Sequence, residues 1–234
     1  MWFFYDYWYI VLVMPAVLFS LWASLKVNST FKKYSTVRSS RGITGAEAAR
    51  RVLDANGLYS VKIDRVRGDL TDHYNPKNNT IYLSDTVYDN PSAAAIGVAA
   101  HEAGHAVQHA VGYVPIKIRS AIIPATRFGS VIAIPLILLG LLFEASGMLY
   151  LAYLGVACFG LSTIFQLVTL PTEFNASRRA LEAIENNGIL ARDEIKDARK
   201  VLSAAAMTYV AALAVSLMQL LRLLLIVSGN NRKR

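Results

Sequence analysis

Two histidines and a glutamate occur at a spacing that suits a metal-dependent hydrolase. His101 and His105 are four residues apart, and Glu102 directly follows the first histidine. On an α-helix, residues i and i+4 lie one turn apart on the same face, so both imidazoles can bind one metal ion. The Glu102 carboxylate then lies beside that ion, where it can take a proton from water. The H-E-x-x-H pattern therefore predicts a zinc site with Glu102 as the catalytic general base.

The residues before this motif favour the helix that the motif requires. Asn90 is a suitable N-cap, Pro91 suits the first helical position, and an alanine-rich run follows. We expect a helix over about residues 91–111. The alternative is an accidental pair of histidines. However, the chain holds only four histidines, and two of them stand at ligand spacing around a glutamate.

The composition indicates a membrane protein. Hydrophobic residues make up 54% of the chain and the mean hydropathy is +0.37, both high for a soluble domain. Residues 7–27, 118–170 and 207–228 form apolar stretches that each exceed the roughly 20 residues needed to cross a bilayer. The middle stretch breaks at residues 144–147, which predicts a hairpin of two spans. The expected total is four spans.

The distribution of basic residues predicts the orientation. Thirteen Lys or Arg lie between Lys26 and Arg119 and six between Arg178 and Lys200, while the hairpin turn has none. The positive-inside rule therefore places both polar segments in the cytoplasm of a cell, which we expect to be bacterial. The first span is expected to be an anchor, not a signal peptide, because no basic region precedes it and residues 1–9 are largely aromatic. Attraction to anionic lipid explains the net charge of +8, and no motif suggests a nucleic-acid partner.

The polar segments are expected to carry the site on a small α+β region. Thr44 and Glu47 match a capping box, which predicts a helix to about residue 56 after a basic linker that includes Lys32 and Lys33. Strands are expected at residues 61–66 and 80–83, with a turn at 75–79. The fold class is thus a mainly α, multi-pass membrane protein with a cytoplasmic zincin-like region. Its expected parts are a first span (1–27), an α+β segment (28–116), a hairpin (117–170), a helical segment (171–206) and a last span with a basic tail (207–234).

Catalytic zinc needs a third protein ligand. His109 is unsuitable, because it lies about 12 Å along the helix axis from His101, and we expect it to be a polar residue on that face. His73 and the carboxylates of segment 171–206 remain as candidates. Topology favours Glu173, because a hairpin returns the chain to the membrane face where the zinc helix lies. The alternative role for Glu173 is a helix-terminal carboxylate that interacts with the helix dipole.

The motifs together resemble a known family. Residues 101–106 (HEAGHA), the apolar hairpin, residues 171–181 (PTEFNASRRAL) and residues 72–76 (DHYNP) are similar to the YugP-type neutral zinc metallopeptidases of bacterial membranes. The arrangement is more distantly similar to the HtpX and CAAX prenyl protease type. The resemblance covers most of the chain. It implies that His101, His105 and Glu173 bind one Zn²⁺ and that Glu102 is the catalytic base. Ser177 stands where the distant relatives have an aspartate, so support for a metal-binding histidine is expected from Ser177, from Asn175 or from another carboxylate.

The expected activity is peptide-bond hydrolysis by a gluzincin-like metalloendopeptidase, in which zinc activates water and Glu102 moves the proton. Candidate donors to the developing oxyanion are His73 and Tyr74, which precede a strand. That strand, with Thr80, Ile81 and Tyr82, is a candidate for binding a peptide or membrane-protein substrate by strand addition, although Tyr82 also suits ordinary packing.

Other classes of function remain open at this point. A catalytically inactive zinc-binding scaffold or regulator is the main alternative, against which the retention of Glu102 argues. A transporter is disfavoured, because the spans carry no continuous polar path. Arg127 is expected to extend toward the headgroups, and the alternatives are a contact with a substrate carboxylate or an ion pair with Glu144 or Asp6. The same alternatives are open for Arg222. The single Cys158 excludes an internal disulfide and a cysteine-based zinc site.

Overall fold

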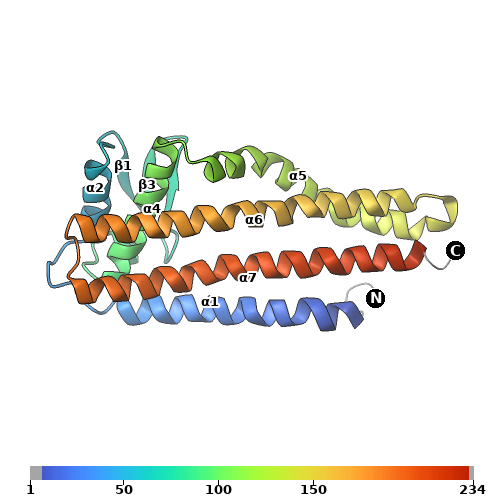
Figure 1. Cartoon of the computed structure of the whole chain (residues 1–234), viewed down its shortest axis with the longest axis horizontal. Coiled ribbons are helices and arrows are strands. Elements are labelled where there is room, and N and C mark those ends of the chain that lie inside the picture. Colours follow the sequence, from blue (N-terminus) through green and yellow to red (C-terminus); the bar gives the residue numbers. More distant parts are fainter. Residues whose placement is uncertain (1–6, 232–234) are drawn as a thin grey trace. The chain divides into compact units, whose positions relative to one another are not determined.

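Long helices dominate the structure, a computed structural model that describes residues 7–231. Residues 1–6, which hold most of the predicted aromatic cluster, and the basic residues 232–234 lie outside the described part. The elements in chain order are a π-helical segment (Tyr9–Val13), α1 (Met14–Tyr34), α2 (Gly45–Ala55), β1 (Lys62–Val66), β2 (His73–Asn75), β3 (Thr80–Ser84), α3 (Asp85–Tyr88), α4 (Ala93–Ala110), α5 (Val114–Leu142), a 3₁₀ turn (Glu144–Ser146), α6 (Leu149–Asn186) and α7 (Arg192–Asn231) (Figure 1).

The chain divides into two compact units. Within the described residues, the first comprises residues 7–22, 118–170 and 208–231, and the second comprises residues 23–117 and 171–207. Within residues 7–231, four helices are long and apolar enough to cross a membrane, which matches the predicted number. These helices are Tyr9–Tyr34, Val114–Leu142, Leu149–Asn186 and Arg192–Gly229.

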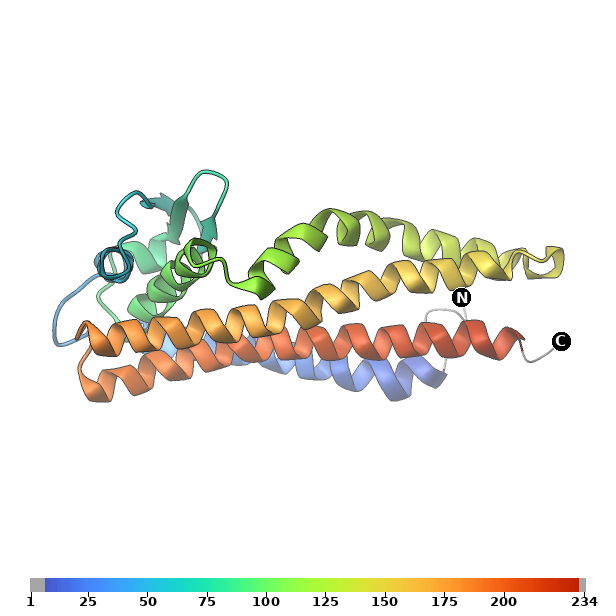
Figure 2. The same ribbon diagram turned by 45° about the horizontal axis from the view of Figure 1, so that its top comes forward.

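In the first unit, α5 and the apolar part of α6 form the predicted hairpin, and the two lie side by side over the part nearest the turn (Figure 2). Small residues allow their backbones to approach. A Cβ atom added to Gly140 would lie 2.2 Å from the Ala152 nitrogen, and one added to Gly155 would lie 2.6 Å from the Ala133 carbonyl oxygen. Such close approach is how spanning helices gain packing energy without a hydrophobic driving force.

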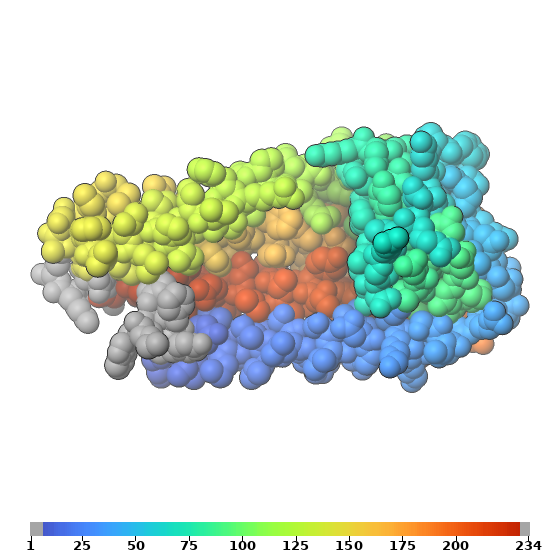
Figure 3. Space-filling view, turned by 180° about the vertical axis from the view of Figure 1, so that it is seen from behind, coloured from blue at the N-terminus to red at the C-terminus, as the bar shows by residue number. Residues whose placement is uncertain are grey.

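The second unit packs a small sheet and α2 against α4. The strand order is β1-β3-β2, with β1 parallel and β2 antiparallel to β3. Its core includes Leu53, Ile81 and Ile96, all fully buried. Strands β1 and β2 reach the surface of this unit (teal in Figure 3), whereas the central strand β3 is largely buried. The predicted capping box is present, since Thr44 Oγ1 accepts from the Glu47 N–H (3.3 Å) and Glu47 Oε2 accepts from the Thr44 N–H (2.9 Å).

Several boundaries differ from the sequence-based expectation. Helix α1 continues to Tyr34, so the predicted linker residues Lys32 and Lys33 are helical. Helix α6 continues through Pro171 without a break. Proline removes one backbone hydrogen bond, but the helical residues before and after Pro171 are packed against other parts of the protein, and this packing maintains the helix. Ser92, not Asn90, caps α4: its hydroxyl accepts from the Ala95 N–H at 3.2 Å.

Candidate metal centre

Three side chains from α4 and α6 converge on one point in the second unit. The Nε2 atoms of His101 and His105 lie 3.2 and 3.4 Å from Glu173 Oε2. Ligand atoms placed 2.0–2.1 Å from a tetrahedral ion are about 3.3–3.4 Å apart, so this spacing fits zinc. These three residues are also the group of His, Cys, Asp or Glu that could hold a metal within the described chain. The structure thus brings the sequence-predicted ligands together.

A glycine inside the motif allows the two helices to meet. A Cβ atom added to Gly104 would lie 2.8 Å from the carbonyl oxygen of Ala176, which is closer than side chains normally approach. The α4 backbone therefore rests directly on α6. Glu173 lies one turn before Ala176 and reaches the imidazoles across this contact. The close approach explains a glycine at this position of the H-E-x-x-H motif.

Glu102 is buried beside the ligands, with 8% of its surface exposed. Its Oε2 atom accepts a hydrogen bond from the backbone N–H of Tyr74 in β2 at 3.0 Å. The short strand β2 was not expected from the sequence, which predicted a turn from Asn75. This strand holds the carboxylate of the predicted general base in a fixed orientation.

The second nitrogen of each histidine contacts a neutral group. His101 Nδ1 lies 3.1 Å from Ser177 Oγ, as expected from the sequence. His105 Nδ1 lies 2.9 Å from Oε1 of Gln108, a fully buried residue whose role the sequence reasoning missed. Asn175, the other expected support, accepts a hydrogen bond from Gln108. The available signal was an amide three residues after His105, on the same helical face.

Burial, hydrogen bonds and neighbouring charges shift the pKa values of several groups around the site, His105 and Asp72 among them. Burial disfavours the charged form of His105, but the hydrogen bond to Glu173 and the charges of Glu102 and Glu173 outweigh it and hold the imidazole pKa above its usual value. Because a metal binds only the neutral imidazole, metal binding competes with protonation of His105. Burial also raises the pKa of the Asp72 carboxyl, although hydrogen bonds from Ser84 oppose this.

His73 is not placed as the oxyanion donor that we expected. It lies directly opposite Tyr82 in the sheet, and their rings stack with centroids 5.0 Å apart. The next pair, Tyr74 and Ile81, packs in the core with α4, and adjacent pairs of side chains point to opposite faces of a sheet. His73 therefore faces away from the metal helix. The Tyr74 hydroxyl donates to Asn79 Oδ1 at 2.9 Å, so it is already engaged elsewhere.

The expectation that Thr80, Ile81 and Tyr82 add a substrate strand is also corrected. These residues lie in β3, the central strand, whose two edges are bonded to β1 and β2. Its backbone groups are used within the sheet, and Thr80 and Ile81 are buried. Among the described residues, the strand with an unpaired edge near Glu102 is β2.

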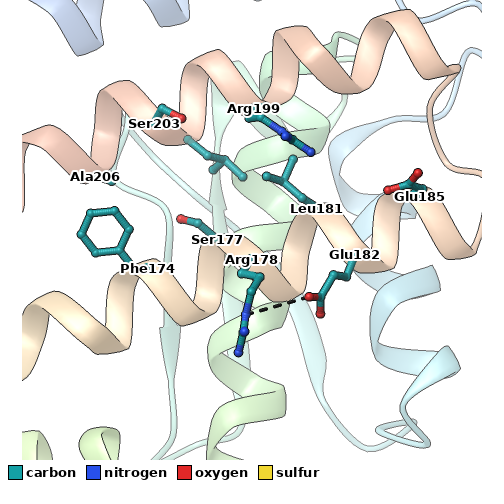
Figure 4. A pocket seen from close by; sticks show the side chains of 10 residues that line it. Phe174, Ser177, Arg178, Leu181, Glu182, Glu185, Arg199, Ser203 and Ala206 are labelled. Atoms are coloured by element: carbon teal, nitrogen blue, oxygen red, sulfur yellow. Dashed lines mark ion pairs between the residues drawn. The ribbon is translucent and has the colours of Figure 1, made fainter.

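Ser177 also borders a cavity of about 390 Å³ between α6 and α7 (Figure 4). Apolar side chains such as Phe174 and Leu181 line it, and Arg178 and Glu182 form an ion pair at its rim, with 3.9 Å between Nε and Oε1. Ser177 therefore lies between the candidate ligand His101 and this cavity.

Comparison with known proteins agrees with this site. Residues 9–228 match the model of a family described as "putative neutral zinc metallopeptidase". The "Putative membrane protease YugP" of Bacillus subtilis (strain 168) is 49% identical over 218 residues, which cover 93% of this chain and 96% of that protein. No solved structure is significantly similar to the chain. On the extent of these matches, the chain belongs to the neutral zinc metallopeptidase family.

Proposed function

We propose that this chain is a membrane-embedded zinc metalloendopeptidase. The observation that carries the proposal is the convergence of His101, His105 and Glu173 at zinc-ligand spacing, with Glu102 buried beside them. A glutamate as third ligand, on a later helix than the H-E-x-x-H motif, is the gluzincin arrangement. Family membership supports a peptidase, and the four apolar helices and the name of the relative fit a membrane protein.

The chain's own residues account for the proton transfers. Zinc held by these three ligands would supply a Lewis acid that polarises water and the scissile carbonyl. Glu102 accepts the proton from the attacking water and passes it to the leaving amine nitrogen. The Tyr74 N–H bonds one carboxylate oxygen of Glu102, which leaves the other oxygen available for the water.

Strand β2 is the proposed support for the substrate. Tyr74 pairs with Ile81, and its N–H points away from β3 toward Glu102. In an antiparallel pair, the C=O of such a residue points the same way as its N–H. The Tyr74 carbonyl can therefore accept a hydrogen bond from an extended substrate peptide. Substrate binding along β2 replaces the strand addition to β3 that the sequence predicted. It favours unfolded peptide segments as substrates, because the bound segment must be extended.

The proposed location of the site is the cytoplasmic face of a bacterial membrane. The test introduces Lys77→Cys in the loop before β3 or Ser146→Cys in the hairpin turn, each in a Cys158→Ser background. The two introduced cysteines should react with a membrane-impermeant maleimide from opposite sides of the membrane. Ser146 should label in intact cells, and Lys77 should label only after the membrane is opened. If the Lys77 cysteine labels fully in intact cells, the proposed orientation is wrong.

Metal removal and replacement test the activity itself. The detergent-purified chain should cleave an unfolded protein such as reduced casein. A zinc chelator should abolish cleavage, and stoichiometric Zn²⁺ should restore it. Mg²⁺ should not restore it, because this ion prefers an octahedral shell of oxygen ligands over two imidazoles. Cleavage that continues in the chelated, zinc-free protein would contradict the proposal, as would a zinc-loaded protein that cuts none of a broad set of unfolded substrates.

A further inference from the structure

Gln108 forms a hydrogen-bond relay that ends at a metal-binding histidine. Its side-chain nitrogen donates to the carbonyl oxygen of Thr172 at 2.8 Å and to Asn175 Oδ1 at 3.0 Å. Its oxygen lies 2.9 Å from His105 Nδ1. The amide is completely buried, so every one of these contacts replaces a hydrogen bond to water. The two acceptors are on α6 and the histidine is on α4.

The chemistry of the neighbours fixes the direction of each hydrogen bond in this relay. The carbonyl oxygen of Thr172 can only accept, so the amide nitrogen of Gln108 must face it. Arg179 Nε, which can only donate, bonds Asn175 Oδ1 at 2.8 Å and turns the oxygen of that amide toward Gln108. The Gln108 oxygen is left facing His105 and must accept its Nδ1–H. With a metal bound, His105 would therefore be held as the tautomer whose Nε2 lone pair is available to the metal.

The other histidine is not fixed in this way. His101 Nδ1 contacts the Ser177 hydroxyl, which can either donate or accept. Gln108 also bonds residues on both sides of Glu173, namely Thr172 just before it and Asn175 two residues after it. One amide thus sets the tautomer of one metal ligand and ties the segment that carries another ligand to α4.

We propose that Gln108 is a positioning residue for the metal centre, which acts by fixing the His105 tautomer and the place of Glu173 relative to α4. The inference rests on the proposed zinc site and deepens it. It assigns to Gln108 a role in metal affinity that does not require contact with metal or substrate. Loss of a hydrogen bond behind a metal-binding histidine typically lowers metal affinity about 10- to 100-fold.

Two substitutions separate positioning from simple packing. Gln108→Met keeps the length of the side chain but bonds neither His105 nor α6. Gln108→Glu keeps an acceptor for the His105 N–H and loses the donors to Thr172 and Asn175. Both variants should lower the melting temperature of the metal-free protein. Gln108→Met should lose about 10- to 100-fold in Zn²⁺ affinity, while Gln108→Glu should bind Zn²⁺ clearly more tightly than Gln108→Met.

The readouts are Zn²⁺ affinity by competition with a chelator and the visible absorption bands of the Co²⁺-substituted protein, which report ligand geometry. Asn90→Leu is the matched control. The Asn90 amide donates to the carbonyls of Ser35 and Thr86 in the same unit and touches no metal ligand. This control should lower the melting temperature and leave the Zn²⁺ affinity and the Co²⁺ bands unchanged.

Three results would overturn the inference while leaving the proposed function standing. The first is a folded Gln108→Met variant with wild-type Zn²⁺ affinity and Co²⁺ bands. The second is equal loss of affinity in Gln108→Glu and Gln108→Met, and the third is an equal loss in Asn90→Leu. A wild-type protein that binds no zinc would instead overturn the proposed function, and the inference with it.

Discussion

Glu173→Ala is expected to release zinc from the protein. This carboxylate is the proposed ligand that faces both imidazoles, at 3.2 and 3.4 Å, and it is buried, with 2% exposed. Without it two histidines remain, one fewer protein ligand than catalytic zinc sites use. The affinity should fall by more than the roughly 100-fold that follows loss of a supporting hydrogen bond. Metal analysis of the purified variant and chelator competition measure this loss, and peptidase activity should disappear with the zinc.

Glu182→Ala is the matched control for this variant. It removes a carboxylate from the same helix, but the Glu182 side chain is 60% exposed and pairs with Arg178 at the surface. It should keep wild-type zinc content and activity. Full zinc occupancy and activity in Glu173→Ala would show that another residue is the third ligand. The unfolding temperature of the metal-free protein should also be compared, because removing a buried carboxylate changes the environment of both histidines.

The parts of the site that follow from local spacing could be predicted from the sequence. His101, Glu102 and His105 need only one helix to be arranged correctly, and the alanine-rich run before them favours that helix. The prediction of Glu173 as the third ligand needed one further argument, namely that an apolar hairpin returns the chain to the side of the membrane from which it started. The capping box at Thr44 is likewise local, and it is formed as expected.

The features that sequence reasoning missed depend on contacts between distant segments. Gln108 acquires its role from Thr172 and Asn175, more than 60 residues away, and nothing near it in the chain indicates these partners. Strand β2 has three residues, too few for a periodic pattern, and it exists because β3 pairs with it. His73 is the first residue of β2, and the register of β2 against β3 determines the face of the sheet to which its side chain points. A shift of this register by one residue would reverse that face.

The choice between two suitable caps shows the same limit. Asn90 and Ser92 both have side chains that can cap α4, and the sequence does not distinguish them. The structure uses the Asn90 amide to bond the carbonyls of Ser35 and Thr86, which join the end of α1 to α3. Ser92 is then left as the cap. Tertiary contacts, not the local preference, therefore determine where α4 begins.

Glu102→Gln is expected to abolish turnover and to leave the metal centre intact. The amide has nearly the volume of the carboxylate, and its carbonyl oxygen can still accept the hydrogen bond from the Tyr74 N–H, now 3.0 Å from Glu102 Oε2. Strand β2 should therefore stay in place, and the three zinc ligands are unchanged. However, an amide cannot accept a proton at neutral pH, so the attacking water is not deprotonated. Turnover should fall by at least about 10²–10⁴, the usual contribution of a general base.

The decisive comparison is between zinc content and cleavage in the same preparation. Glu102→Gln should hold one zinc per chain and bind an unfolded peptide without cutting it. The control Glu185→Gln removes an equivalent charge from an exposed position on α6 and should cleave at the wild-type rate. An inactive scaffold would lose nothing from the first change, because metal, fold and substrate contacts all survive it. Full complementation of a deletion strain by Glu102→Gln, with zinc bound, would therefore refute the peptidase proposal, since proton transfer is the one property that this substitution removes.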